Sequence, residues 1–318
     1  MRYITDTTEF QIEVPTIVTL GKFDGRHRGH QKLLRTMEEL KAELGYATAV
    51  FTFLSAPSGV VSGQSQTVIT TNLERRVNME RMGIDYLIES PFTEEIRHMR
   101  PEAFVKEILI GSMNAKVIVV GPDCRFGYEG EGNASLLKKL AQEWGYRLCV
   151  IEKEQDEERD ISSTYIREEL EKGNMEKANL LLGEPYSICG EVVHGDHIGG
   201  RILGFPTANL TPSPMKHLPR NGVYASRVWV DGSYYRGVTN IGRKPTVPGD
   251  YPIGVETHIL DLDQDIYGSF IEVQLLVFER PERKFNSMKE LKKQIGLDKD
   301  FVTDYFKDHP EITLGRIG

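Results

Sequence analysis

Two histidines three residues apart are the strongest indication of chemistry in this chain. His27 and His30 lie within the segment Gly21-Lys22-Phe23-Asp24-Gly25-Arg26-His27-Arg28-Gly29-His30. Imidazoles at this spacing can donate hydrogen bonds to phosphoryl oxygens from two sides, and so stabilise charge that builds up on a phosphorus centre. The same pair is also compatible with metal binding, or with a helix end that has no chemical role.

The surroundings of the histidines favour the phosphate interpretation. Gly21 and Gly25 permit tight turns and let a phosphate approach the backbone. The segment follows an apolar run at 16–20, which predicts a buried strand, and it precedes a helix that begins near Gly29 and His30. Because the N-terminus of a helix attracts anions, and because open α/β sheets bind ligands at such strand-to-helix loops, we expect a phosphate site here.

The first half of the chain alternates apolar runs with helical patterns. Strands are predicted at 16–20, 47–53, 86–88, 117–120 and 148–151, and helices at 30–44, 73–82, 101–110 and 134–143. Strands that are apolar throughout and alternate with helices are typical of a parallel sheet covered on both faces. The sequence therefore predicts a Rossmann-like α/β domain.

The pattern changes near residue 184. Two helical segments, 163–172 and 174–182, come before it, and strands at 187–194, 223–230, 234–240, 254–260 and 270–280 come after it. Regularly spaced strands without helices between them indicate an antiparallel barrel or sandwich. The chain then ends on helices, one of which begins at the capping box Ser287-Met288-Lys289-Glu290. We predict domains at 1–183 and 184–318.

Composition excludes several classes of protein. The net charge is −8 and the basic residues are scattered, which argues against nucleic acid or an anionic membrane as a partner. The apolar runs are too short to span a bilayer, and no signal peptide is evident. Three cysteines without a CxxC motif fit a reducing compartment, so we expect a cytoplasmic protein. The oligomeric state does not follow from the sequence.

The second half contains a string that a barrel core explains poorly, Gly204-Phe205-Pro206-Thr207-Ala208-Asn209-Leu210. The Thr207 hydroxyl and the Asn209 carbonyl are hard oxygen donors that suit Mg²⁺ carrying ATP phosphates. A turn stabilised by the same two side chains is the alternative interpretation. Upstream, the glycine-rich segment 190–201, which contains Gly195, is compatible with a loop over phosphates.

Three strings in the first half resemble the bacterial riboflavin kinase/FAD synthetase family. His27-Arg28-Gly29-His30 is similar to the HxGH signature of nucleotidyltransferases, and Gly121-Pro122-Asp123-Cys124-Arg125-Phe126-Gly127 matches a loop that follows a buried strand. Ile161-Ser162-Ser163-Thr164-Tyr165-Ile166-Arg167 is similar to the ISSTxIR signature, although Ser163 and Thr164 alone would read as a plain helix cap. The resemblance implies catalytic roles for His27, His30 and Arg167, and nucleotide contacts from Gly21, Phe23, Asp24, Gly25, Gly29, Asp123, Phe126, Gly127, Ser163 and Thr164.

The second half resembles the riboflavin kinase module of the same family. Pro206-Thr207-Ala208-Asn209 matches its PTAN motif, and further matches occur around Asn240 and at Val255-Glu256-Thr257-His258. The resemblance implies that Glu256 is the base for the riboflavin 5′-hydroxyl, that Thr207 and Asn209 hold Mg²⁺, and that Gly195, Gly204, Pro206 and Asn240 bind substrates. Without the family, Glu256 reads as an exposed strand residue.

The resemblance covers residues 14 to 305 and implies a bifunctional enzyme. ATP would phosphorylate riboflavin to FMN in the barrel and adenylylate FMN to FAD in the α/β domain. The chain departs from the family at Phe53-Leu54-Ser55-Ala56-Pro57, which lacks a histidine, at Cys124, and at Gly199-Gly200, where the glycine-rich loop is longer. Two rival functions are a paralogue with only the adenylyltransferase activity and a non-catalytic flavin- or nucleotide-binding regulator.

Overall fold

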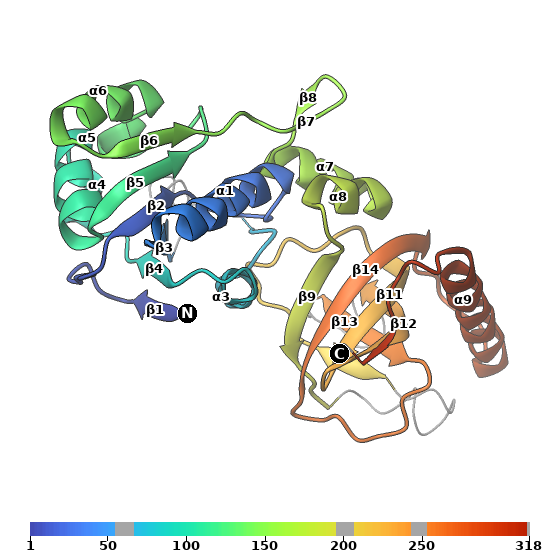
Figure 1. The fold of residues 1–318 in the computed structure, drawn as a ribbon. Coiled ribbons are helices and arrows are strands. Elements are labelled where there is room, and N and C mark those ends of the chain that lie inside the picture. Colours follow the sequence, from blue (N-terminus) through green and yellow to red (C-terminus); the bar gives the residue numbers. More distant parts are fainter. Residues whose placement is uncertain (55–66, 195–206, 243–252, 317–318) are drawn as a thin grey trace. The chain divides into compact units, whose positions relative to one another are not determined.

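The computed structural model describes residues 1–54, 67–194, 207–242 and 253–316. It divides into two compact units, Met1–Ser163 and Thr164–Gly318 (Figure 1). The functional boundary predicted near residue 184 stays a prediction. Within the described ranges, no helix has both the length and the apolar character needed to cross a bilayer.

The first unit is built on a parallel sheet, as the sequence predicts, and this sheet has six strands where five were predicted. Its strands run in the order β1-β4-β3-β2-β5-β6. They are β1 (Arg2–Thr5), β2 (Thr16–Leu20), β3 (Ala47–Phe53), β4 (Tyr86–Ser90), β5 (Ala115–Val120) and β6 (Arg147–Val150). The predicted strands at 16–20 and 47–53 match β2 and β3, whereas β1 was not predicted because its four residues carry no apolar run.

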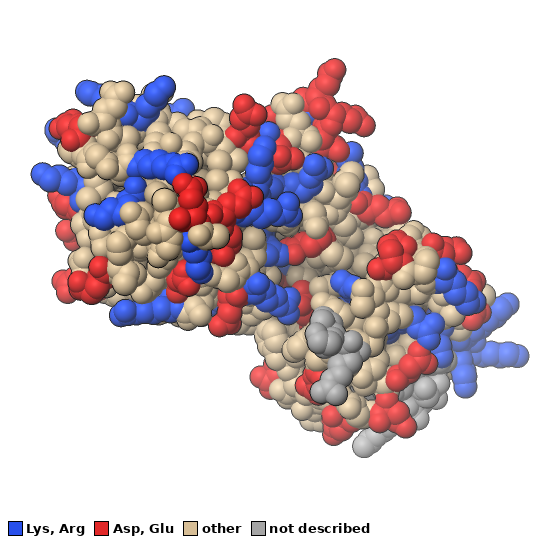
Figure 2. Space-filling view, viewed as in Figure 1, with Lys and Arg blue, Asp and Glu red and all other residues tan. Residues whose placement is uncertain are grey.

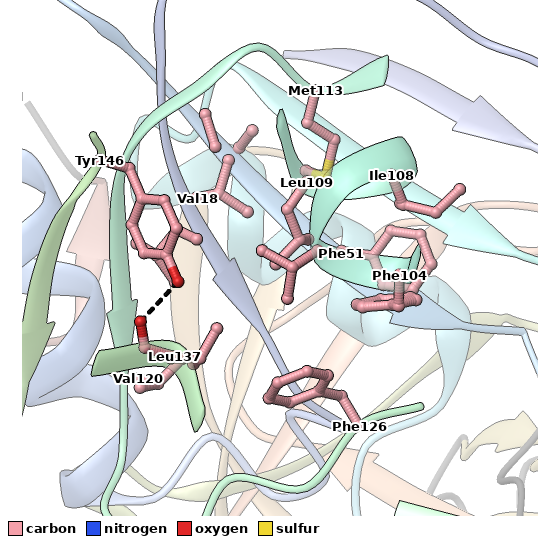
Figure 3. Packing of buried hydrophobic residues seen from close by; sticks show 14 of the residues in the cluster. Val18, Phe51, Phe104, Ile108, Leu109, Met113, Val120, Phe126, Leu137 and Tyr146 are labelled. Carbon is pink, nitrogen blue, oxygen red and sulfur yellow. Dashed lines mark hydrogen bonds between the residues drawn. The ribbon is translucent and has the colours of Figure 1, made fainter. Parts of the chain in front are cut away.

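Alternation along the strands supplies a hydrophobic core to each face of this sheet. Val18 and Phe51 belong to one cluster, which includes residues of the π-helix η1 (Phe104–Ser112) and of α6 (Ala134–Trp144) (Figure 3). Ile17 and Val50 belong to the other, which packs on α1 (Arg28–Leu44) and α3 (Asn72–Arg81). The sheet is thus covered on both faces, which explains why its strands are apolar throughout.

The predicted helix at 101–110 takes a more complex form. A single turn, α5 (Pro101–Ala103), leads into η1, whose end is marked by the bond from the Met113 N–H to the Ile108 carbonyl. Hydrogen bonds of this i→i+5 type are rare and cannot be read from apolar spacing. The short helix α4 (Glu94–His98) precedes it.

Strand order places a switch point at the centre of the sheet. β2 pairs with β3 on one side and with β5 on the other. The chain leaves β2 toward β3 and leaves β5 toward β6, in opposite directions across the sheet. Ligands of open α/β sheets bind in the crevice that such a reversal leaves at the carboxyl ends of the strands. The loops after β2 and β5 are therefore the expected walls of a site.

The second unit is an antiparallel barrel, again as predicted. Its main strands run in the order β10-β13-β12-β11-β14-β9. They are β9 (Tyr186–Glu191), β10 (Ala208–Leu210), β11 (Gly222–Val230), β12 (Ser233–Gly242), β13 (Gly254–Ile259) and β14 (Phe270–Arg280). The N–H of Val193 donates to the Asn209 carbonyl at 2.9 Å, so the segment after β9 bridges to β10 and joins the two ends of the sheet.

Helices flank this barrel in the sequence. α7 (Ser163–Lys172) and α8 (Met175–Leu182) precede it, and Asn179 of α8 is bonded both to the carbonyls of Leu275 and Leu276 and to the N–H of Tyr186. After β14 the chain forms one long helix, α9 (Met288–Asp308), and a short strand, β15 (Gly315–Arg316), which pairs with β12. Ser287 caps α9 by accepting from the Glu290 N–H, which confirms the predicted helix start.

Candidate functional site

The loop after β2 is pinned to the segment that precedes α3. The Asp24 carboxylate accepts from the N–H groups of Ile69 at 2.7 Å and Thr70 at 3.1 Å, and the Gly25 N–H donates to the Thr70 hydroxyl at 3.1 Å. Gly25 has φ +63°, and a Cβ there would lie 2.8 Å from Ile69 Cδ1. Glycine is therefore required at position 25 by both conformation and space.

His27 and His30 come together where this loop enters α1. Their rings stack with centroids 3.8 Å apart, and the Phe23 ring lies 5.0 Å from that of His30. His27 is the N-cap residue of α1, yet its side chain forms no capping bond, and the first turn carries no acidic residue. The amide groups at this helix end are therefore available to an anion.

Gly29 is what lets the two rings stack over the start of the helix. A Cβ at this position would lie 3.2 Å from Nδ1 and 3.3 Å from Cε1 of the His27 ring. Even alanine would therefore force the imidazole to move. Packing against the His27 ring therefore explains why a glycine lies between the two histidines.

Both histidines have a depressed pKa, because the surrounding protein desolvates the charged form. The pKa of His27 is lowered to about 4, although Asp123 and Asp24 partly offset the effect of burial. Burial and the neighbouring His27 hold the pKa of His30 well below its usual value of 6.5. The Nδ1 atoms of both rings are buried and have no hydrogen-bond partner among the described residues. The lowered pKa values indicate that both imidazoles are neutral at pH 7, and His30 also forms a hydrogen bond with the backbone of Gly25.

The loop after β5 contributes residues of two kinds. Asp123 is exposed, lies close enough to His27 to act on its charge, and pairs with Lys153 at 3.1 Å. Phe126, predicted to contact nucleotide, is 6% exposed and packs against Phe104 in the hydrophobic core. Gly127 has φ +71°, and a Cβ there would overlap Pro101. The last two positions therefore support the fold of the loop, and Cys124 is half-buried beside them.

A hydrogen bond of Ser163 joins the start of α7 to the histidine loop. The Ser163 hydroxyl donates to the carbonyl of Asp24 at 2.7 Å. Thr164 is exposed, and Arg167 lies one turn further along the helix and is half-buried. Ser163 thus makes a structural contact, and its predicted contact with nucleotide stays a prediction.

The acidic stretch 152–160 has a defined structure. It forms a hairpin of β7 (Gln155–Asp156) and β8 (Arg159–Asp160), and acidic side chains project from its tip (Figure 2). Glu154 pairs with Arg28 at 3.2 Å and with Lys32 at 3.0 Å, and these cations hold its pKa below the usual value. Sequence reasoning could not find this pairing, because Glu154 is far along the chain from both cations.

Three predicted site residues of the second unit lie in one row across neighbouring strands. Asn209 of β10 is opposite Glu256 of β13, which is opposite Asn240 of β12. All three are half-buried, whereas their neighbours Ala208 and Thr257 are buried on the other face. Cross-strand partners share a face, so the three side chains lie side by side.

Thr207 precedes this row, and its carbonyl accepts from the Asn209 amide at 3.2 Å. Gly195, Gly204 and Pro206 lie outside the described residues, as do Ser55–Pro57 and Gly199-Gly200.

Glu282 is a carboxylate at this row that was not predicted. It accepts from the Asn240 amide at 3.4 Å, and it occupies the space that a side chain at Gly242 would fill. Partial burial raises the pKa of its carboxyl group. It was missed because it lies beyond the end of β14, in a charged segment that has no motif.

Comparison with known proteins matches each part of the chain to a family of its own. Residues 9–165 match the FAD synthetase family, and residues 182–306 match the riboflavin kinase family. The bifunctional riboflavin kinase/FMN adenylyltransferase of Bacillus subtilis is 37% identical over 93% of this chain and 94% of its own length. The enzyme of the same description from Escherichia coli strain K12 is 35% identical over 91% and 92%.

A crystal structure described as a macrolide-efflux protein from Streptococcus pneumoniae is also similar. It superposes with a TM-score of 0.82 at 30% identity, over 95% of this chain and 98% of its own.

A nucleotidyltransferase-like α/β unit and a flavokinase-like barrel on one chain define a two-module transferase. The chain belongs to the bifunctional riboflavin kinase/FMN adenylyltransferase family. ATP, riboflavin and FMN are the substrates that follow from this membership.

Proposed function

We propose that the histidine loop transfers the adenylyl group of ATP to FMN, and that the barrel transfers the γ-phosphoryl group of ATP to riboflavin. The observation that carries the first assignment is the stacked pair His27 and His30 at the open N-terminus of α1. The pair lies at the carboxyl end of the central strand β2, beside the switch point of the sheet.

In the proposed adenylyl transfer, a phosphate oxygen of FMN attacks the α-phosphorus of ATP. The bond to the β-phosphate breaks and pyrophosphate leaves. FMN is already an anion, so no base is required; the protein positions the groups and disperses charge. Neutral His27 and His30 donate to phosphoryl oxygens, and the amides of α1 add their dipole. Arg167 supplies a further charge, while Gly21, Phe23, Asp24, Gly25, Gly29, Asp123, Phe126, Gly127, Ser163 and Thr164 shape or contact the nucleotide site.

In the proposed kinase reaction, the riboflavin 5′-hydroxyl attacks the γ-phosphorus and ADP leaves. Glu256 accepts the hydroxyl proton as the new bond forms. Its half-buried place between Asn209 and Asn240 supports this role, because the amides can orient substrate groups beside the carboxylate. Gly195, Gly204, Pro206 and Asn240 complete the proposed substrate contacts.

Mg²⁺ is the proposed metal of the kinase site. Thr207 and Asn209 would hold it, because their neutral oxygens, together with ATP phosphates, are the hard donors that this ion prefers. The described residues contain no cluster of three His, Cys, Asp or Glu side chains that would hold a metal, so a metal here would depend on such neutral donors and on the nucleotide. When bound, Mg²⁺ would neutralise charge on the transferring phosphate.

We further propose that the adenylyltransferase domain spans 1–183, that the kinase domain spans 184–318, and that the protein acts in the cytoplasm. The compartment is supported by the three cysteines, which form no disulfide and are all within the described residues. Nucleic acid and membranes are not proposed partners. The net charge is −8, and acidic and basic side chains are interspersed on the face shown in Figure 2.

The deciding experiment supplies riboflavin and FMN separately, each with ATP and Mg²⁺, and resolves FMN from FAD. A bifunctional enzyme converts riboflavin to FMN and FMN to FAD. Conversion of FMN alone would replace the proposal with a single-activity adenylyltransferase. Binding of both flavins without turnover of either would indicate a regulator.

A further inference from the structure

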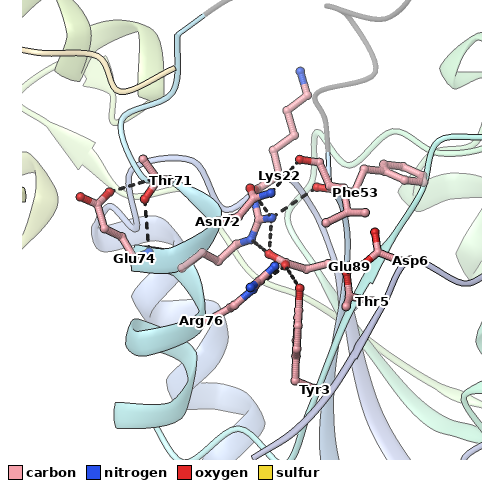
Figure 4. A network of polar contacts seen from close by, with 12 residues as sticks. Tyr3, Thr5, Asp6, Lys22, Phe53, Thr71, Asn72, Glu74, Arg76 and Glu89 are labelled. Carbon is pink, nitrogen blue, oxygen red and sulfur yellow. Dashed lines mark hydrogen bonds and ion pairs between the residues drawn. The ribbon is translucent and has the colours of Figure 1, made fainter. Parts of the chain in front are cut away.

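A buried ion-pair network lies at the carboxyl end of β4, outside the motifs discussed so far. Glu89 is fully buried there (Figure 4). Its Oε1 accepts from Arg75 Nε at 2.7 Å, and its Oε2 accepts from Arg76 Nε at 2.9 Å and from the Tyr3 hydroxyl at 2.5 Å. The two carboxylate oxygens therefore have separate sets of partners.

The Oε1 side of the network leads to the histidine loop. The Arg75 guanidinium donates to the carbonyls of Lys22, just after β2, and Phe53, at the end of β3, each at 3.4 Å. It also donates to the Asn72 side chain at 2.9 Å, and that amide donates to the Leu54 carbonyl at 3.0 Å. One cation thus joins the ends of two neighbouring strands beside the proposed site.

Lys22 directly precedes the residue that supports the catalytic ring. Phe23 has φ +49°, a left-handed conformation that is unfavourable for a bulky residue and that persists only where its surroundings fix it. Phe23 is 2% exposed, and its ring lies 5.0 Å from that of His30. Arg75 therefore holds the peptide that sets Phe23, and Phe23 packs against His30.

The Oε2 side leads away from the loop. Arg76 stacks over the Tyr3 ring at 4.1 Å and is partly exposed, and Tyr3 belongs to β1 at the edge of the sheet. The two neighbouring arginines share one carboxylate, but only Arg75 contacts the segment that leads into the histidine loop. They provide a matched pair for experiment.

We propose that Glu89 and Arg75 are positioning residues for adenylyl transfer, a role that rests on the function proposed above for the histidine loop. Burying this ion pair costs desolvation energy. In other proteins, buried ion pairs can often be replaced by apolar residues without loss of stability. What an apolar replacement cannot supply is a planar fork that donates to several acceptors in fixed directions. The network fixes the positions of the ends of β2 and β3 relative to the His27 and His30 rings.

The test compares Arg75→Lys with Arg76→Lys, since each keeps the positive charge and removes the guanidinium fork. We expect Arg75→Lys to lower kcat for FAD formation by about 10-fold or more, with KM for ATP and FMN changed by less than about 3-fold, because misplaced groups lose rate before affinity. Riboflavin kinase activity of the same chain should stay at the wild-type level. Arg76→Lys should lower thermal stability and leave kcat of both reactions unchanged.

Three outcomes would overturn the proposal: an unchanged kcat for FAD formation in Arg75→Lys, an equal loss in both variants, or a parallel loss of kinase activity. If Arg75→Lys does not accumulate as folded protein, Asn72→Ala removes one acceptor of the same guanidinium and should also lower kcat selectively. Absence of FAD formation by the wild-type enzyme would instead remove the proposed function itself, so the two failures are distinguishable.

Discussion

The hydroxyl of Ser163 donates to the backbone carbonyl of Asp24 across 139 residues of sequence. The carboxylate of the same aspartate accepts from the amides of Ile69 and Thr70. Asp24 thus joins three segments: the histidine loop, the approach to α3 and the first residue of α7. Asp24, which the sequence assigns to nucleotide binding, therefore also holds the segments of the site together.

Replacement of Ser163 by alanine tests this connection. The variant loses one hydrogen bond to the loop, which we expect to cost about 1 kcal/mol of unfolding free energy in the first unit. We also expect a lower rate of FAD formation under conditions in which the variant is fully folded, because the start of α7 is released from Asp24. Urea unfolding and initial rates measure the two effects, and an unaltered rate would show that the bond does not order the loop.

His30→Asn should remove most adenylyl transfer. The change keeps a donor but withdraws the imidazole from the stack on His27, and loss of one preorganised donor typically costs about 10²- to 10³-fold in rate. FAD formation from FMN is the measurement, and FMN formation from riboflavin is the internal control. Loss of both activities would contradict two separate sites.

Gly29→Ala should slow the same reaction through a steric effect alone. Its new Cβ would lie 3.2 Å from the His27 ring, so the ring must shift by a few tenths of an ångström from its present position. We expect about 10-fold or greater loss of FAD formation, since small displacements of catalytic groups are costly. Gly296→Ala is the control: this glycine lies in α9, and a Cβ added there would meet nothing within 4 Å, so both activities should persist. Equal effects of the two changes would contradict a steric role for Gly29.

The histidine pair should make the first unit sensitive to acid. Each group has a folded-state pKa below its ordinary value of 6.5, and that of His27 is about 4. Below pH 6.5 the unfolded chain binds protons that the folded chain does not, so stability falls as the pH drops from 6.5 toward 4. The double variant His27→Asn/His30→Asn should show a shallower fall of unfolding free energy between pH 7 and about 4.5. Parallel curves for the two proteins would contradict the depressed pKa values.

Glu256→Gln should abolish FMN formation while FAD formation continues. The amide retains the shape of the side chain beside Asn209 and Asn240 but cannot accept the hydroxyl proton. A Glu256→Gln enzyme that phosphorylates riboflavin at the wild-type rate would exclude this residue as the base. The FAD activity of the same preparation shows whether the chain is folded.

Much of the fold follows from the sequence, because long apolar runs decide where buried strands lie. β2, β3 and β14 have the predicted bounds, and α1 ends at Leu44, as the predicted helix does. β10 was not predicted, because its three residues lie inside a string whose Pro, Thr and Asn indicated a binding motif instead. Short strands depend on their partners more than on their own residues.

The site is predictable only where local spacing carries the chemistry. The pair His27 and His30 is adjacent on one helix turn, so sequence reasoning finds it. The contacts of Glu89 with Arg75 and of Glu154 with Arg28 join separate segments, and a charged residue in isolation reads as a surface residue. Phe126 shows that a residue within a binding-type loop can also belong to the hydrophobic core, which the loop motif alone does not reveal.

The pairing of β9 with β14 has a consequence for synthesis. Tyr186 of β9 pairs with Leu275 of β14. The first strand of the barrel therefore cannot pair with β14 until β14 has been synthesised. At roughly 5–20 residues per second, a ribosome needs about 4–16 s to pass from Glu191 to Phe270. By then every strand of the parallel sheet has left the peptidyl transferase centre, since β6 ends at Val150. The two halves therefore mature in sequence order, and a chain that stops before β14 leaves an unpaired strand edge open to aggregation.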